Sequence, residues 1–172
     1  MKRILSGKNL FLILLLVICI SFISISLFLR NKQDDFNFRL NYSVLGREQI
    51  DTYNNTFTKD LVINGTKTIQ FKIPVEVKNK IYSLMREIDI MSFPDTLENA
   101  GISVSPSSDY KLTVLIDGKT KTIIWKEGLY PEMTNNLPRN NREFLKLVKY
   151  IQDYIYSTKE YKSMPEANGG YA

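Results

Sequence analysis

A run of twenty uncharged residues, Leu10 to Leu29, constrains this chain more than any other feature. As a helix rising about 1.5 Å per residue, such a run spans a hydrocarbon core of roughly 30 Å and satisfies its own backbone hydrogen bonds. Basic residues flank it on both sides: Lys2, Arg3 and Lys8 precede it, and Arg30 and Lys32 follow it. The sequence therefore predicts a transmembrane helix over residues 10–29, with the membrane as the chain's first partner.

The charge balance across this run predicts the orientation. Basic residues favour the cytoplasmic side, which places a short N-terminus, residues 1–9, in the cytoplasm and the rest outside. Cleavage as a secretory signal is the alternative, but signal peptides have apolar regions of roughly 7 to 15 residues. Ser24-Ile-Ser26 is the best small-residue match for a cleavage site, and Ile18 precedes Cys19 where a lipid-modified cysteine has a small residue. We therefore expect an uncleaved anchor in the cell membrane.

The remaining length suits one ordinary domain. After the apolar run about 140 residues remain, enough to bury a core. We expect a linker over residues 30–35, an α+β extracytoplasmic domain over 36–160 and a C-terminal tail over 161–172. Three of the 23 basic residues precede the run, which leaves 20 against 18 acidic residues. This balance, without a basic aromatic cluster, gives no indication of nucleic-acid binding.

The composition excludes several kinds of catalysis. The chain has no histidine and a single cysteine, Cys19, inside the apolar run. Ser-His-Asp catalysis, histidine-ligated zinc and a thiolate nucleophile are therefore not expected. Phosphate-binding, dinucleotide-binding, nucleophile-elbow and EF-hand motifs are also missing from the sequence. The sequence thus predicts a protein that is not an enzyme and that needs no cofactor or metal.

Apolar periodicity predicts strands first and then a helix. Phe36, Phe38, Leu40, Tyr42 and Val44 alternate with polar residues, as in a strand with one buried face. A mixed segment over 50–62 leads to Asn64-Gly65, a hairpin signal. Pro74 suits the first turn of a helix. The face of that helix expected to cover the sheet consists of Val77, Ile81, Leu84 and Ile88.

Asp117-Gly118 is the clearest turn signal, because this dipeptide favours a two-residue type I′ hairpin. Such a turn places Tyr110 opposite Trp125 and Leu112 opposite Ile123, on the buried side. Asn140 is the predicted N-cap of a last helix whose apolar face consists of Leu145, Val148, Ile151, Tyr154 and Ile155. The order β-β-β-α-β-β-α predicts a two-layer α+β domain, with a mostly antiparallel sheet covered by two helices.

Several short motifs resemble a family of small, uncharacterised, membrane-anchored or lipid-anchored proteins of Gram-positive bacteria. They are Thr58-Lys59-Asp60 after a Tyr53/Phe57 strand, Glu87-Ile88-Asp89 with Phe93-Pro94-Asp95, and Glu160 to Pro165 followed by Gly169-Gly170-Tyr171. The resemblance covers about residues 46 to 172. It implies an exposed location at a bacterial cell envelope and no reaction. Unlike the lipid-anchored members, this chain has no usable lipobox.

Two long segments, Ser92 to Asp109 and Lys126 to Arg139, enter and leave the Asp117-Gly118 hairpin. Loops of this length are usually functional or disordered, and both are expected at the end of the sheet opposite the turn. The binding residues that we predict there are Asp95, Glu98, Asp109, Tyr110, Trp125, Glu127, Tyr130 and Arg139. The alternative interpretation is that Tyr110 and Trp125 are core residues and that the charged side chains form a solvated rim.

Three functions remain open from the sequence. The first is a membrane-anchored extracytoplasmic module that binds a cell-wall polymer or an envelope protein. The second is a hydrolase of cell-wall glycan that uses two carboxylates from Asp95, Glu98, Asp109 and Glu127. The third is a structural subunit that uses the apolar helix as its interface. The tail is expected to dock on the sheet through Tyr161 and Met164.

Overall fold

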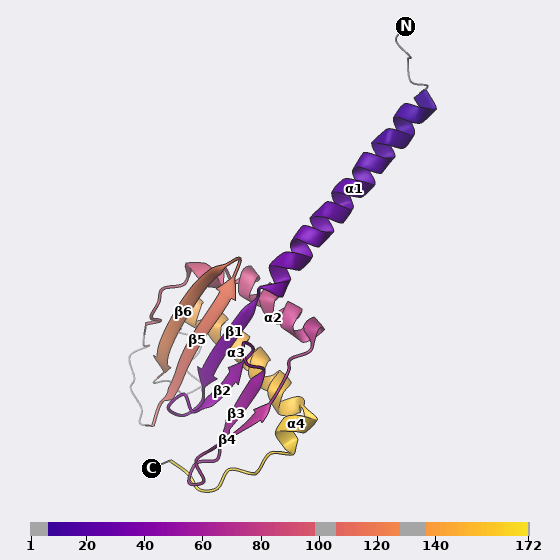
Figure 1. Cartoon of the computed structure of the whole chain (residues 1–172). Coiled ribbons are helices and arrows are strands. Elements are labelled where there is room, and N and C mark those ends of the chain that lie inside the picture. Colours follow the sequence, from indigo (N-terminus) through magenta and orange to yellow (C-terminus); the bar gives the residue numbers. More distant parts are fainter. Residues whose placement is uncertain (1–6, 99–105, 128–136, 172) are drawn as a thin grey trace. The chain divides into compact units, whose positions relative to one another are not determined.

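The computed structural model describes residues 7–98, 106–127 and 137–171 (Figure 1). The chain divides into two compact units, residues 1–35 and 36–172. The first unit contains one helix, and the second contains the sheet and the remaining helices.

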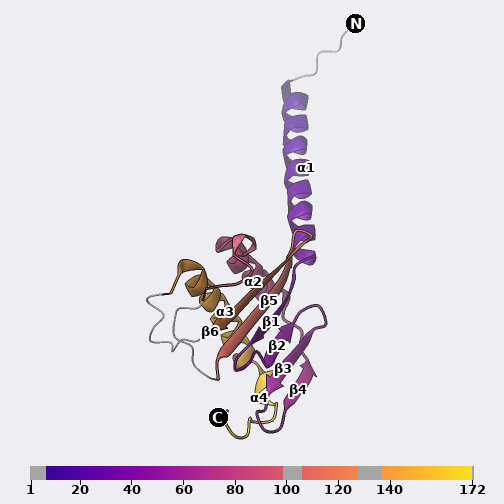
Figure 2. The same ribbon diagram turned by 90° about the vertical axis from the view of Figure 1, so that its left-hand side faces the viewer.

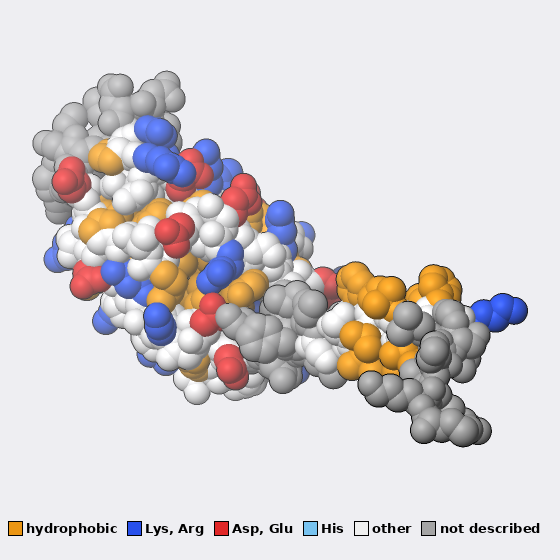
Figure 3. All heavy atoms as spheres, turned by 90° about the horizontal axis from the view of Figure 1, so that it is seen from above, with side chains coloured by type: hydrophobic (Ala, Val, Ile, Leu, Met, Phe, Trp, Pro, Cys, Tyr) orange, Lys and Arg blue, Asp and Glu red, His pale blue; other side chains and the backbone are white. Residues whose placement is uncertain are grey.

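The apolar run forms the helix α1, Gly7–Asp34, of 28 residues. Its described apolar side chains, from Phe11 to Phe22, are exposed, and hydrophobic atoms dominate its coloured surface (Figure 3). Residues 30–34, predicted as a linker, instead continue the helix, because no glycine or proline interrupts them. Within the described residues, no helix combines the length and the apolar character needed to cross a membrane.

The second unit is built on a six-stranded antiparallel sheet (Figure 1). The spatial order of the strands is β4-β3-β2-β1-β5-β6. Their bounds are β1 Asn37–Tyr42, β2 Glu48–Asp51, β3 Thr56–Asp60, β4 Thr66–Gln70, β5 Ser108–Ile116 and β6 Lys119–Glu127. The prediction of a mostly antiparallel α+β domain is confirmed.

Two helices, α2 (Val75–Glu87) and α3 (Arg139–Ser157), cover one face of this sheet (Figure 2). The alternating residues of β1 point toward them, and Phe38, Leu40 and Tyr42 are fully buried. From the helices, Ile81 and Met85 of α2 and Phe144, Leu147, Val148, Ile151 and Ile155 of α3 complete the core. The polar residues that alternate with these apolar residues along the strands point to the opposite face of the sheet.

Four strands precede α2, although the sequence predicted three. The mixed segment over 50–62 contains the end of β2, a turn and the whole of β3. Asp51 stabilises that turn, because its carboxylate accepts from the backbone N–H groups of Tyr53 (2.9 Å) and Asn54 (3.2 Å). Asn55 adopts a positive φ of 51°, which asparagine tolerates.

The boundaries of the two helices differ slightly from those predicted. Pro74 was predicted in the first turn of a helix and is the N-cap of α2, and Pro138 rather than Asn140 is the N-cap of α3. Prolines suit both positions because their missing N–H and fixed φ suit the start of a helix. A 3-10 turn, η1 (Ile90–Ser92), follows α2.

The hairpin at Asp117-Gly118 forms as predicted. Both residues have positive φ, 51° and 72°, as a type I′ turn requires. The register pairs Tyr110 with Trp125 and Leu112 with Ile123. The prediction that these four side chains face the core is confirmed by their burial.

The tail docks on the domain, as predicted. In the short helix α4, Lys159–Lys162, the Tyr161 ring packs on Phe57, and after the helix the Met164 side chain is buried in the core. Asn168 then pairs with the β3–β4 connection through a parallel bridge to Val62. Further on, the Tyr171 hydroxyl donates to Asp60 and accepts from Arg47.

Candidate functional site

The Tyr110–Trp125 pair belongs to the core. Its rings stack with centroids 5.4 Å apart, and the Phe144 ring of α3 packs edge-on against both. Tyr110 is 8% exposed and Trp125 is 1% exposed. The alternative interpretation, that the two rings are core residues, therefore describes their packing, and Tyr110 also lines an open pocket on the sheet.

Two of the predicted carboxylates lie on opposite faces of the sheet. Asp95 forms an ion pair with Lys121 (2.5 Å), whose register partner Val114 is a core residue. Asp109 lies opposite Lys126, one residue from the inward-facing Tyr110, and therefore points to the other face. A hydrolytic pair made of Asp95 and Asp109 is excluded by this arrangement.

The remaining predicted residues are also dispersed. Glu98 lies beside the start of α3, because its carbonyl accepts from the buried Asn141 amide at 2.8 Å, and exposed Arg139 is the first residue of that helix. Tyr130 lies outside the described residues. Glu127 ends β6, and its side chain lies outside the described residues.

The structure instead presents an open pocket on the face of the sheet that the helices leave uncovered. We call this the outer face; its residues include Arg39, Asn41, Gln49, Asp51, Thr58, Thr68, Asp109, Lys111, Thr113, Thr122, Ile124 and Lys126. The pocket has a volume of about 340 Å³. Its lining consists of Asn41, Leu45, Gly46, Asp109, Tyr110, Lys111, Ile124 and Lys126.

A strained loop, residues 43–46, forms one wall of this pocket. Ser43, Leu45 and Gly46 all have positive φ, and for a leucine a φ of 54° is unfavourable. The segment 107–109 holds the loop in place: Leu45 N–H donates to Ser107 O and Asp109 N–H donates to Ser43 O, both at 3.1 Å. Leu45 is 55% exposed and lines the pocket.

The pocket combines apolar and cationic groups. Ile124, 40% exposed, lies directly opposite Lys111, and Lys126 lies directly opposite Asp109. The Asp109 carboxylate accepts from the Ser107 hydroxyl at 3.1 Å. Among the described residues, neither lysine has an ion pair. Two such ammonium groups beside exposed Leu45 and Ile124 can bind an anionic ligand that also has an apolar part.

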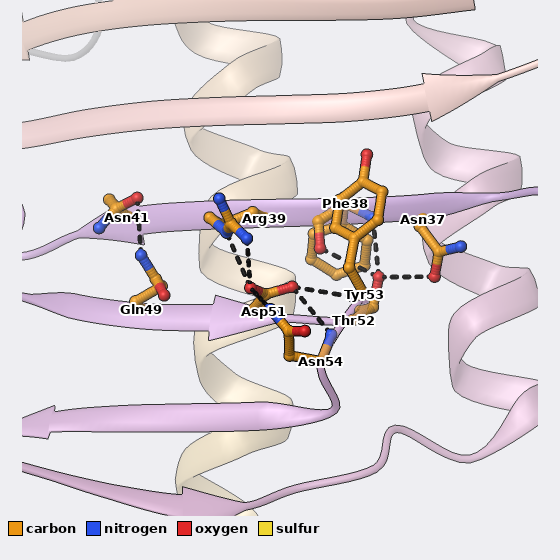
Figure 4. A network of polar contacts seen from close by, with 9 residues as sticks. All are labelled: Asn37, Phe38, Arg39, Asn41, Gln49, Asp51, Thr52, Tyr53 and Asn54. Carbon is orange, nitrogen blue, oxygen red and sulfur yellow. Dashed lines mark hydrogen bonds and ion pairs between the residues drawn. The ribbon is translucent and has the colours of Figure 1, made fainter. Parts of the chain in front are cut away.

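Beside the pocket, a polar network fixes the centre of the outer face (Figure 4). Asp51 receives hydrogen bonds from Arg39 Nε (2.8 Å) and from the Asn54 amide (2.9 Å). Burial alone would raise the pKa of Asp51, but the hydrogen bonds from Arg39 and Asn54 lower it below its ordinary value. On the same face, Asn41 accepts from Gln49 (3.2 Å) and donates to Gly46 O (3.2 Å), and this separate pair of bonds supports the pocket wall.

A second polar cluster lies on the buried face, under the tail. Glu48 is 6% exposed and accepts a hydrogen bond from the Tyr156 hydroxyl at 2.8 Å. Burial raises the pKa of Glu48, and the nearby Asp60 raises it further, against the lowering effects of Tyr156 and Lys59. The Lys59 ammonium lies 4.5 Å from the centroid of the Tyr161 ring. This cluster joins β2 and β3 to α3 and the tail, so its role is structural.

Two of the predicted binding residues, Asp109 and Tyr110, line this pocket, and the sequence did not indicate its other residues for an identifiable reason. The alternation of β5 and β6 indicates which residues face outward, but these positions carry no motif. The exposed Leu45 depends on a left-handed backbone that leucine does not favour and that the sequence therefore does not signal.

No protein-family model matches the chain, and no curated protein sequence matches it.

Proposed function

We propose that this protein is a membrane-anchored binding or accessory module of a bacterial cell envelope, and that its ligand occupies the outer-face pocket. The ligand is an anionic component of the envelope with an apolar part. The anchor is α1, and the domain lies on the extracytoplasmic side. This is a proposal for binding without turnover.

The proposal for the anchor is supported by the sequence of α1. Its uncharged run of twenty residues, between basic flanks, has the length that a hydrocarbon core requires. Within α1 the structure describes the side chains of Lys8, residues 11–22 and Ser24, so the run of twenty is taken from the sequence. The resemblance to anchored proteins of Gram-positive bacteria is consistent with the same location.

One observation carries the binding proposal: Leu45 is held in a strained conformation at the rim of a pocket that also contains two lysines, neither of which forms an ion pair with another described residue. Strain of this kind costs of order 1–3 kcal/mol and persists where the surrounding structure imposes it, commonly at ligand sites. Here the backbone bonds to Ser107 and Asp109 impose it.

The test measures binding of anionic wall polymer and of wall glycan fragments to the full chain in detergent micelles. Leu45→Gly removes the apolar rim and relieves the strain, so we expect weaker binding and a free energy of unfolding that stays equal or rises by up to about 1 kcal/mol. Lys111→Ala and Lys126→Ala should each weaken binding at least severalfold.

Lys119→Ala is the matched control, because Lys119 is an exposed lysine of the same hairpin at its opposite end. It should bind as the wild type does. Equal affinity in all four variants, or failure of every envelope anion to bind the wild type, would contradict the proposal.

A further inference from the structure

The two edge strands of the sheet, β6 and β4, differ in whether another segment pairs with their outer side. Residues 95–97 cover the outer edge of β6 through a parallel bridge from Thr96 to Ile124. Leu97 N–H donates to Ile124 O (2.9 Å), and Ile124 N–H donates to Asp95 O (2.8 Å). At the other edge the sheet ends with β4, and within the described residues no segment pairs with its outer side.

The ladder between β3 and β4 identifies the backbone groups at this edge. Leu61 N–H donates to Gly65 O (2.8 Å), and Phe71 N–H donates to Asn55 O (2.7 Å). Hydrogen-bonded pairs alternate along an antiparallel ladder, so Lys67 and Ile69 bond to β3. The N–H and C=O groups of Thr66, Thr68 and Gln70 therefore point away from the sheet.

The side chains leave this edge accessible. Thr66, Lys67, Thr68 and Gln70 are exposed, and Ile69 is partly buried against the core. The strand contains no proline, and threonine and isoleucine favour extended backbone. An exposed strand edge of this kind is a template for pairing with another strand.

We propose that the partner strand is β4 of a second copy of this chain, paired antiparallel about Thr68. In this register Thr68 lies opposite Thr68 of the second copy, and Thr66 lies opposite Gln70. Each of these residues exchanges both backbone bonds with the residue opposite it.

The sequence of β4 is compatible with its own reversal, which favours a second copy as the partner. Lys67 is the one charged residue of the strand, and it lies opposite the uncharged Ile69 of the second copy rather than opposite Lys67. Like charges directly opposite each other would destabilise the pair, whereas threonine pairs stabilise it. The interface is independent of the outer-face pocket.

Disulfide crosslinking of the full chain in detergent micelles tests this register, with Cys19→Ser removing the native thiol. Directly opposed residues of a hydrogen-bonded pair have Cα atoms about 5.5 Å apart, within the range of a disulfide. Thr68→Cys should therefore give a covalent dimer on mild oxidation. Thr58→Cys, on the same face of β3, should not, because its copies would be about 14 Å apart across three strand spacings.

A proline pair separates loss of association from loss of folding. Thr68→Pro removes the outward N–H and the exposed hydroxyl contact with Thr58 (2.8 Å) but no backbone bond to β3, whereas Ile69→Pro removes a backbone bond to β3. We expect Thr68→Pro to keep the wild-type thermal midpoint within a few degrees and to reduce the dimer fraction at least tenfold by light scattering. Ile69→Pro should lower the thermal midpoint.

Three results would overturn the proposal. They are a wild-type chain that stays monomeric at high concentration, equal crosslinking of Thr58→Cys and Thr68→Cys, and a Thr68→Pro variant that dimerises as the wild type does. A Thr68→Cys adduct with a different protein would mean that the edge serves another partner, which also contradicts it.

Discussion

At the scale of single residues, β2 carries two buried carboxylates whose pKa values shift in opposite directions. Asp51 lies on the outer face, where Arg39 and Asn54 stabilise its charged form. Glu48 lies on the buried face, where desolvation favours its protonated form. Because the two positions are three residues apart, the alternation of the strand alone places them in these opposite environments.

The two carboxylates should therefore give stability profiles of opposite sign. The lowered pKa of Asp51 contributes stability that is present above the ordinary aspartate pKa near 4 and is lost as the pH falls through the folded-state pKa. Asp51→Asn should cost about 1–3 kcal/mol at pH 7, because it removes a charged hydrogen-bond acceptor, and should have less effect in acid. Denaturant unfolding at pH 7 and at pH 3.5 measures both values.

Glu48→Gln is the matched variant, because it keeps an acceptor for Tyr156 and removes the charge. The raised pKa of Glu48 makes ionisation cost stability as the pH rises from the ordinary glutamate value through the folded-state pKa. Glu48→Gln should thus gain stability relative to the wild type as the pH rises. Parallel pH profiles for both variants would contradict these assignments.

At the scale of elements, the sequence predicted correctly those elements that depend on interactions between residues close together in the chain. The hairpin at Asp117-Gly118 and the strand over 37–42 formed where turn chemistry and alternation placed them. The turn between β2 and β3 was not predictable in this way. It depends on the Asp51 carboxylate, which accepts hydrogen bonds from the backbone N–H groups of Tyr53 and Asn54 and also from Arg39 of the neighbouring strand β1. The candidate site was predicted only in part for a similar reason: Asp109 and Tyr110 line the pocket, but Phe144, distant in sequence, covers the rings of Tyr110 and Trp125.

The docked tail gives a prediction for an element that has little regular structure. Gly169 has a φ of +88°, and a Cβ there would lie 2.5 Å from Ile63 Cδ1. Gly169→Ala should therefore cost about 1–3 kcal/mol of stability and loosen the tail. A Cβ at Gly170 meets no atom within 4 Å, so Gly170→Ala is the control and should change stability by less than about 0.5 kcal/mol. Unfolding curves and protease sensitivity of the tail that do not distinguish the two variants would show that this contact is unimportant.

At the scale of the whole molecule, the two units differ in the kinds of side chain on their surfaces. Hydrophobic side chains dominate the coloured part of α1, whereas basic and acidic side chains are interspersed over the domain in the same view (Figure 3). Such a mixed surface suits an aqueous environment, and an exposed apolar helix needs either lipid or a protein partner. The proposed function agrees with this difference, because it places the apolar helix in the lipid bilayer and the charged domain, with its binding pocket, in water.

The orientation in the membrane can be measured directly, by labelling intact cells with a membrane-impermeant maleimide. In a Cys19→Ser background, Lys119→Cys places a thiol at the exposed end of the β5–β6 hairpin, and Ser6→Cys places one before the apolar run without removing a basic residue. Because three basic residues precede the run, we expect Lys119→Cys to react without lysis and Ser6→Cys to react only after it. The reverse pattern would place the domain in the cytoplasm and exclude wall polymers as ligands of the pocket. Reaction of both variants without lysis would mean that the helix does not span the membrane.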